Sequence, residues 1–132
     1  MTPSTSPQRI LIVEDEYFIA ADLAKVLKGS GLEVMGPAAT LDDAGAVIAR
    51  EGLPDAAILD VNVASILSFK LAEDLVDQHV PVMFVTGYDG WHLPDTFRKY
   101  PRITKPARPE QLLTILAEMM EDSHADPTQP VA

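Results

Sequence analysis

The stretch ILIVEDEYFIAADL, from Ile10 to Leu23, runs from four apolar residues into three consecutive acids and then into an amphipathic pattern. The apolar residues predict a buried strand, and the spacing of apolar residues after the acids predicts a helix. Adjacent carboxylates repel one another, so three of them at the end of a buried strand are unfavourable unless a cation binds there. The fold and the function therefore depend on which other residues lie near these three acids.

The length and composition predict one soluble domain. The chain has 132 residues, enough for one hydrophobic core, and a formal net charge of −10 without a basic cluster, which argues against a nucleic-acid partner. It has no cysteine, so any metal must be held by oxygen or imidazole. No apolar run approaches the roughly 20 residues that cross a bilayer, and the polar start MTPSTSPQ does not resemble a secretory signal. We therefore expect a cytoplasmic protein without membrane contact.

Short apolar or β-branched runs alternate with longer amphipathic ones along the chain. The predicted strands are Arg9–Val13, Leu32–Gly36, Ala56–Asp60, Pro81–Thr86 and Arg102–Thr104. The predicted helices are Tyr17–Lys28, Leu41–Glu51 with Thr40 as its N-cap, Ser65–Gln78 and Pro109–Glu121, with a shorter one near Pro94–Tyr100. This alternation predicts a three-layer α/β domain with right-handed crossovers.

The positions of Pro, Gly and polar residues predict the boundaries of the domain and the length of its fourth helix. The polar, Pro-rich ends predict disordered tails at residues 1–8 and 122–132, around one domain at residues 9–121. Gly90, Pro94 and Pro101 leave room for only about two helical turns between the last two strands. We therefore expect the fourth helix to be short or unwound, and the segment from Gly87 to Tyr100 to be mobile and to belong to the output surface.

Polar side chains follow four of the predicted strands. They are Glu14, Asp15 and Glu16 after the first strand, Asp60 at the end of the third, Thr86 at the end of the fourth and Lys105 after the fifth. In open parallel sheets these strand ends meet at one edge, where ligands bind. Carboxylates from two strands form a site suited to Mg²⁺, which would relieve the repulsion between the acids. A carboxylate such as Asp60 can also attack phosphorus, with Lys105 and Thr86 stabilising the phosphoryl oxygens.

The motifs LIVEDE, AAILDVN, FVTGYD and ITKPARPEQL, in this order, resemble the receiver domain of two-component response regulators from Arg9 to about Glu121. The form FVTGY further resembles the alphaproteobacterial FAT GUY receivers, which are often stand-alone. The resemblance implies a flavodoxin-like, doubly wound sheet of five parallel strands in the order 2-1-3-4-5, with helices on both faces. It also implies a cis bond between Lys105 and Pro106.

The same resemblance implies a role for each matched residue. Asp60 is expected to be the phosphoacceptor, Lys105 to pair with the phosphoryl group and Thr86 to be the switch hydroxyl, with the small Gly87 leaving access. Mg²⁺ is expected to be bound directly by Asp15, through water by Glu14 and by the backbone carbonyl of Asn62, and Asp60 is also expected to be among its ligands. The implied partners are a histidine kinase of the HWE or a related class, or a phosphotransfer protein, and a downstream protein effector. The chain itself is expected to be no enzyme beyond its own phosphorylation and dephosphorylation, and to be a monomer or a weak homodimer.

One position departs from the family pattern. Many receivers have an aromatic residue three positions before the lysine, where this chain has Arg102. We expect Arg102 to change the switch and to find a carboxylate, either Asp89, Asp95 or one on a partner. Identical spectral shifts around the fifth strand in Arg102→Ala and the wild type, on adding a phosphoryl mimic, would contradict this.

Other readings of the same residues remain. Asp15 or Glu16 could merely cap the following helix, and Lys105 could be a surface cation. A haloacid dehalogenase-type phosphatase would need an acid where Asn62 stands, and a flavin site would need a phosphate cradle in place of the three acids. Two alternatives stay open within the receiver class: a phosphate sink for a shared kinase, and an interaction module that works without phosphorylation.

Overall fold

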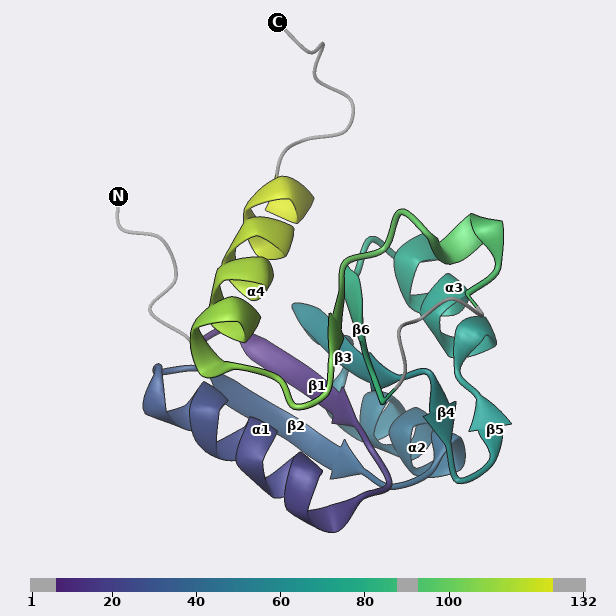
Figure 1. The fold of residues 1–132 in the computed structure, drawn as a ribbon, viewed down its shortest axis with the longest axis horizontal. Coiled ribbons are helices and arrows are strands. Elements are labelled where there is room, and N and C mark those ends of the chain that lie inside the picture. The colour runs from purple at the N-terminus through teal and green to yellow at the C-terminus, as the bar shows by residue number, and fades with distance from the viewer. Residues whose placement is uncertain (1–6, 88–92, 125–132) are drawn as a thin grey trace, which may run out of the picture.

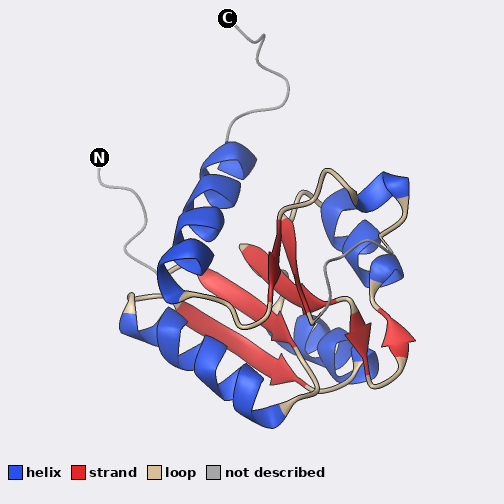
Figure 2. Ribbon diagram, in the orientation of Figure 1, coloured by secondary structure: helices blue, strands red, loops and turns tan. Residues whose placement is uncertain are grey.

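The computed structural model describes residues 7–87 and 93–124. The strands of its main sheet are β1 (Arg9–Val13), β2 (Glu33–Ala38), β3 (Ala56–Asp60), β6 (Val82–Thr86) and β7 (Arg102–Thr104). The helices are α1 (Tyr17–Gly29), α2 (Leu41–Glu51), α3 (Phe69–Asp77) and α4 (Pro109–His124), with a 3₁₀ helix, η1, at Asp95–Phe97. The strands of this sheet and the helices alternate along the chain as the sequence predicts (Figures 1 and 2).

The five strands form one parallel sheet in the order β2-β1-β3-β6-β7. Because β6 and β7 are the fourth and fifth strands of this sheet, the predicted order 2-1-3-4-5 is confirmed. Every residue of β3 and β6 is buried, which explains why these segments are continuous apolar runs. The edge strand β2 runs two residues past its predicted end and contains Pro37, which an edge strand tolerates.

The helices cover both faces of the sheet. One core lies beneath α1 and α4 and includes Leu27 and Leu116, together with Ile10 and Ile58 from the strands. The other lies beneath α2, α3 and η1, on the opposite face. In Figure 1, α1 and α2 lie on opposite sides of β1 and β2. The sheet is thus the middle layer of three, as predicted.

A small hairpin between β3 and α3 was not predicted. Its strands, β4 (Asn62–Val63) and β5 (Ile66–Leu67), are antiparallel, and α3 begins only at Phe69, so the predicted start at Ser65 is wrong. The turn residues Ala64 and Ser65 have φ angles of 50° and 70°, in the left-handed region that such turns need. Two-residue strands leave no periodic pattern, and neither turn residue is one that typically signals a hairpin.

The helix predicted between the last two strands of the sheet is short, as expected. In the described part of this segment, η1 spans only three residues. Its residue Phe97 stacks on Phe69 with ring centroids 4.7 Å apart and contacts Phe84 and Tyr100 edge to face. Phe84 belongs to β6 and stacks on Tyr100, so this cluster joins α3, η1 and the sheet. Residues 88–92 lie outside the described residues, and the predicted mobility of Gly87–Tyr100 stays a prediction.

The amino ends of the strands are joined by Arg9. Its guanidinium donates hydrogen bonds to the carbonyl oxygens of Glu51 and Leu53, each at 2.8 Å, and its backbone N–H donates to Asp55 Oδ2 at 2.7 Å. These contacts attach β1 to the loop that enters β3. Among the described residues, none of the helices has both the length and the apolar character that a membrane crossing requires.

Candidate functional site

The carboxyl ends of β1, β3, β6 and β7 line one cleft of about 540 Å³. Backbone hydrogen bonds fix two of the loops that follow these strands: Glu14 N–H donates to Ala38 O at 2.9 Å, and Lys105 N–H donates to Thr86 O at 2.8 Å. The predicted convergence of Glu14, Asp60, Thr86 and Lys105 at one edge is therefore what the sheet register produces. The residues that line the cleft are Asp15, Glu16, Asp60, Val61, Asn62, Ser65, Leu67, Thr86, Gly87, Leu93 and Lys105.

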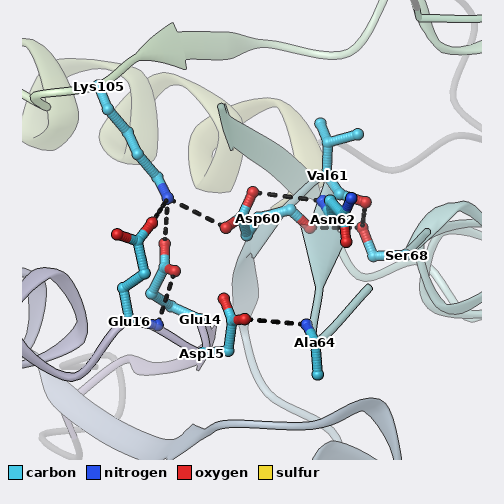
Figure 3. A network of polar contacts seen from close by, with 9 residues as sticks. All are labelled: Glu14, Asp15, Glu16, Asp60, Val61, Asn62, Ala64, Ser68 and Lys105. Carbon is cyan, nitrogen blue, oxygen red and sulfur yellow. Dashed lines mark hydrogen bonds and ion pairs between the residues drawn. The ribbon is translucent and has the colours of Figure 1, made fainter. Parts of the chain in front are cut away.

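The Lys105 ammonium is the centre of the polar network (Figure 3). Its Nζ lies 2.9 Å from Glu14 Oε1, 3.0 Å from Glu16 Oε1 and 3.0 Å from Asp60 Oδ2. Only 12% of the side chain is exposed. Burial by itself would lower the pKa of Lys105, but its hydrogen bonds to the three carboxylates outweigh burial and raise the pKa. Lys105 therefore stays charged at any physiological pH.

Glu14 is the most deeply buried of these acids. Its side chain is 1% exposed, and its Oε2 accepts a hydrogen bond from Glu16 N–H at 3.1 Å. Burial raises the pKa of Glu14 from 4.5 to about 7, and the nearby charge of Asp60 also raises it, whereas the bonds to Lys105 and to Glu16 N–H act in the opposite direction. A bound cation would favour the ionised form of this carboxyl.

Asp60 is held on three sides. Its Oδ2 accepts from Lys105, and its Oδ1 accepts from Asn62 N–H at 3.3 Å. Its backbone carbonyl accepts a 2.6 Å hydrogen bond from the hydroxyl of Ser68, which is fully buried. These bonds fix the end of β3, so the carboxylate faces the cleft (Figure 3).

Asp15 contacts the unpredicted hairpin. Its side chain is exposed, and its Oδ2 accepts a 3.0 Å hydrogen bond from Ala64 N–H. Carboxylate oxygens of Glu14, Asp15 and Asp60 all lie within 4.8 Å of one another. Three such oxygens with neither thiol nor imidazole among them fit a hard, oxygen-binding cation such as Mg²⁺.

The remaining predicted residues fall in different places. Thr86 is buried at the end of β6 and lines the cleft with Asn62, which is exposed. The Lys105–Pro106 bond is cis, as predicted. Arg102 is exposed and does not line the cleft.

The carboxylate that Arg102 was expected to find is not seen. Within residues 7–87 and 93–124, Arg102 forms no ion pair, and Asp95 pairs instead with Arg98 at 3.1 Å. The other intramolecular candidate, Asp89, lies outside the described residues. A carboxylate on a partner stays a prediction.

Three contributions to the site were missed from the sequence. They are the contact of Glu16 with Lys105, the hydroxyl of Ser68 and the N–H of Ala64. The first joins residues 89 positions apart, and the second and third depend on a hairpin that leaves little trace in the sequence. Of these three, only the contact of Glu16 with Lys105 had a signal in the sequence, namely the three consecutive acids. That signal did not show which of the acids would contact the lysine.

Comparison with known proteins shows a consistent family likeness. Residues 10–117 match the family described as response regulator receiver domain. The chain is 30% identical over 119 residues to the phyllosphere-induced regulator PhyR of Methylorubrum extorquens, covering 84% of this chain and 43% of that protein. It is 31% identical over 83 residues to the transcriptional regulatory protein PdtaR of Mycobacterium tuberculosis, covering 62% and 40%. The chain thus spans less than half the length of these two relatives.

The likeness extends to a solved structure. The solution structure of the receiver domain of PhyR from Erythrobacter litoralis superposes with a TM-score of 0.80 and 27% sequence identity, covering 97% of this chain and all of that one.

Proposed function

The chain belongs to the response regulator receiver domain family of two-component signalling, and on this premise we propose that Asp60 is its phosphoacceptor. The observation that carries this proposal is the contact of Asp60 Oδ2 with Lys105 Nζ at 3.0 Å, in a cleft that Asp15 also lines. The buried Glu14 offers a carboxylate oxygen within 4.8 Å of those of Asp15 and Asp60. A nucleophilic carboxylate, a fixed ammonium and a group of oxygen ligands together are what phosphoryl transfer to a carboxylate needs.

The proposed reaction forms one bond and breaks one. An Asp60 carboxylate oxygen attacks the phosphorus of the donor, and the bond from phosphorus to the donor's histidine nitrogen, or to the acetate oxygen of acetyl phosphate, breaks. Glu14, Asp15, Asp60 and the carbonyl of Asn62 would hold Mg²⁺, which neutralises charge on the phosphoryl oxygens when it is bound. Lys105 stabilises the same charge from its own side.

The proposed output is a change of the protein surface. Thr86 lies one strand away from Asp60 in the sheet, and it would respond to the phosphoryl group as the switch hydroxyl. Arg102 lies in β7, whose backbone pairs with β6 up to Thr86, so a movement of Thr86 would reach the exposed face that carries Arg102. A histidine kinase, of the HWE or a related class, or a phosphotransfer protein would be the donor, and a protein effector would bind the changed face.

The test is the intact mass of the protein after incubation with acetyl phosphate and Mg²⁺. We expect a phosphoryl adduct in the wild type that disappears in Asp60→Asn and on chelation of Mg²⁺. Asp77→Asn, which removes an exposed carboxylate at the end of α3, is the matched control and should keep the adduct.

Two results would favour the alternatives. If the folded wild type forms no adduct and binds no beryllofluoride, the chain is an interaction module that works without phosphorylation. If the adduct forms but no protein is captured more strongly in the presence of beryllofluoride, the chain is a phosphate sink for its kinase.

A further inference from the structure

We propose that Glu16 is a positioning residue that competes with the phosphoryl group for the ammonium of Lys105. This inference rests on the proposed phosphorylation of Asp60 and goes beyond it. It assigns to Glu16 a restraining effect: its carboxylate holds Lys105 before transfer and must release it for the phosphoryl oxygen to bind.

The Lys105 ammonium has a limited number of hydrogen-bond donors. A lysine ammonium has three N–H donors, and Lys105 has three carboxylate oxygens within 3.0 Å, from Glu14, Glu16 and Asp60. A phosphoryl oxygen arriving at Asp60 needs at least one of these donors. The hydrogen-bond acceptors of Lys105 are Glu16 and Asp60, whereas Glu14 Oε1 faces the ammonium as an ion pair. Because Asp60 itself carries the phosphoryl group, the phosphoryl oxygen competes with Glu16 for its place at the ammonium.

Burial decides which contact opens. The side chain of Glu14 is 1% exposed, so its oxygen would stay without water if it lost the ammonium, and Asp60 is the residue that receives the phosphoryl group. The side chain of Glu16 is 60% exposed, and water can replace the ammonium at its oxygen. Glu16 is thus the acid that releases Lys105 at the lowest cost.

The backbone around Glu16 allows this release. Its N–H is held by Glu14 Oε2 at 3.1 Å, so the residue stays in place while its side chain turns away. Glu16 is also the N-cap residue of α1, yet in the described part of the chain its side chain makes no capping hydrogen bond. Replacing the side chain therefore frees Lys105 without removing a bond that starts the helix.

The transfer step stays balanced in this scheme. The oxygen of Asp60 gains the bond to phosphorus, the donor loses it, and no proton leaves Lys105. One N–H of Lys105 exchanges a carboxylate oxygen of Glu16 for a phosphoryl oxygen. Because the contact with Glu16 exists only before the transfer, it stabilises the unphosphorylated form and opposes the reaction.

The test compares beryllofluoride affinity and the rate of phosphorylation by acetyl phosphate, both with Mg²⁺, in the full chain. We expect Glu16→Ala to increase both by about two- to fivefold, the usual effect of one ion pair whose acid is exposed. Glu16→Asp keeps the charge but is one methylene too short to reach Lys105, so it should show a similar increase. Glu33→Ala removes an exposed carboxylate at the amino end of β2, the other edge of the sheet, and should behave as the wild type.

A spectroscopic readout separates this effect from a general change in structure. The side-chain ¹⁵N resonance of Lys105 should differ between the wild type and Glu16→Ala without a mimic, and should coincide once beryllofluoride is bound to both. Unchanged or weaker beryllofluoride binding in Glu16→Ala, beside a wild type that binds, overturns the role of Glu16 alone. An increase in Glu16→Ala but not in Glu16→Asp also overturns it, because the negative charge and not the contact would then be responsible. A wild type that neither binds the mimic nor is phosphorylated overturns the proposed function as well.

Discussion

Replacing Glu14 by Gln should remove a specific part of the pH dependence of stability. Burial raises the pKa of Glu14 from 4.5 to about 7, so the folded chain keeps this proton over a range in which the unfolded chain has lost it. Below pH 4.5 both states are protonated, and above pH 7 both are ionised. Between these values each rise in pH therefore lowers the free energy of unfolding.

The size of the effect follows from the same two values. At about 1.4 kcal/mol for each pH unit, the difference between 4.5 and about 7 corresponds to roughly 3 kcal/mol of stability lost between these pH values. Gln has no proton to lose in this range. The free energy of unfolding of the wild type should therefore fall by this amount relative to that of Glu14→Gln as the pH rises. Lys105 does not contribute, because its raised pKa keeps it charged throughout this range.

Urea unfolding at pH 4.5, 5.5, 6.5 and 7.5, in buffer free of Mg²⁺, measures this difference. Glu33→Gln, an exposed acid at the opposite edge of the sheet, should keep the wild-type pH dependence. Saturating Mg²⁺ should reduce the loss, since the cation replaces the proton at Glu14. If the free energy of unfolding changes with pH by the same amount in the wild type and in Glu14→Gln, within about 0.5 kcal/mol, burial at this position does not favour the neutral acid.

Two further predictions concern residues that shape the strand ends. Gly36→Ala should destabilise the fold by about 2–4 kcal/mol in urea unfolding, because Gly36 has φ +88° and a Cβ would lie 2.7 Å from the backbone N of Ala38. Gly45→Ala, where a Cβ would meet no described atom within 4 Å inside helix α2, should instead stabilise by about 0.5–1 kcal/mol, and equal effects would contradict the argument. Ser68→Ala removes the 2.6 Å hydrogen bond to the buried end of β3 and should cost about 1–3 kcal/mol, whereas unchanged stability would mean that water replaces the hydroxyl.

The sheet and its strand order could be predicted because each strand carries its own signal. β1, β3 and β7 have the predicted bounds, since the first two are short apolar runs that end at an acid and the third ends at the lysine. Helix α2 also has its predicted bounds, and Thr40 caps it by accepting from Asp43 N–H at 3.0 Å. Local signals of this kind do not depend on the rest of the fold.

The parts that escaped prediction depend on contacts distant in sequence. The β4–β5 hairpin is stabilised by a hydrogen bond from Ala64 N–H to Asp15, 49 positions away in the sequence. Its two strands have only two residues each, which is too short for an alternating pattern to be recognised in the sequence. The convergence of acids and lysine was predicted from the strand ends, but the choice of Glu16 as the third partner of Lys105 depends on side-chain geometry. The sequence therefore predicted which residue types meet, and the structure was needed to show which atoms do.

The Arg9 contacts have a consequence for how this domain can diverge. They close the amino edge of the sheet through two carbonyl oxygens and Asp55, and none of these groups lines the cleft at the other edge. Substitutions among the acids of the cleft therefore leave the groups that Arg9 contacts unchanged. The hydrogen bonds that hold the amino ends of β1 and β3 together and the polar network at their carboxyl ends thus have no residue in common.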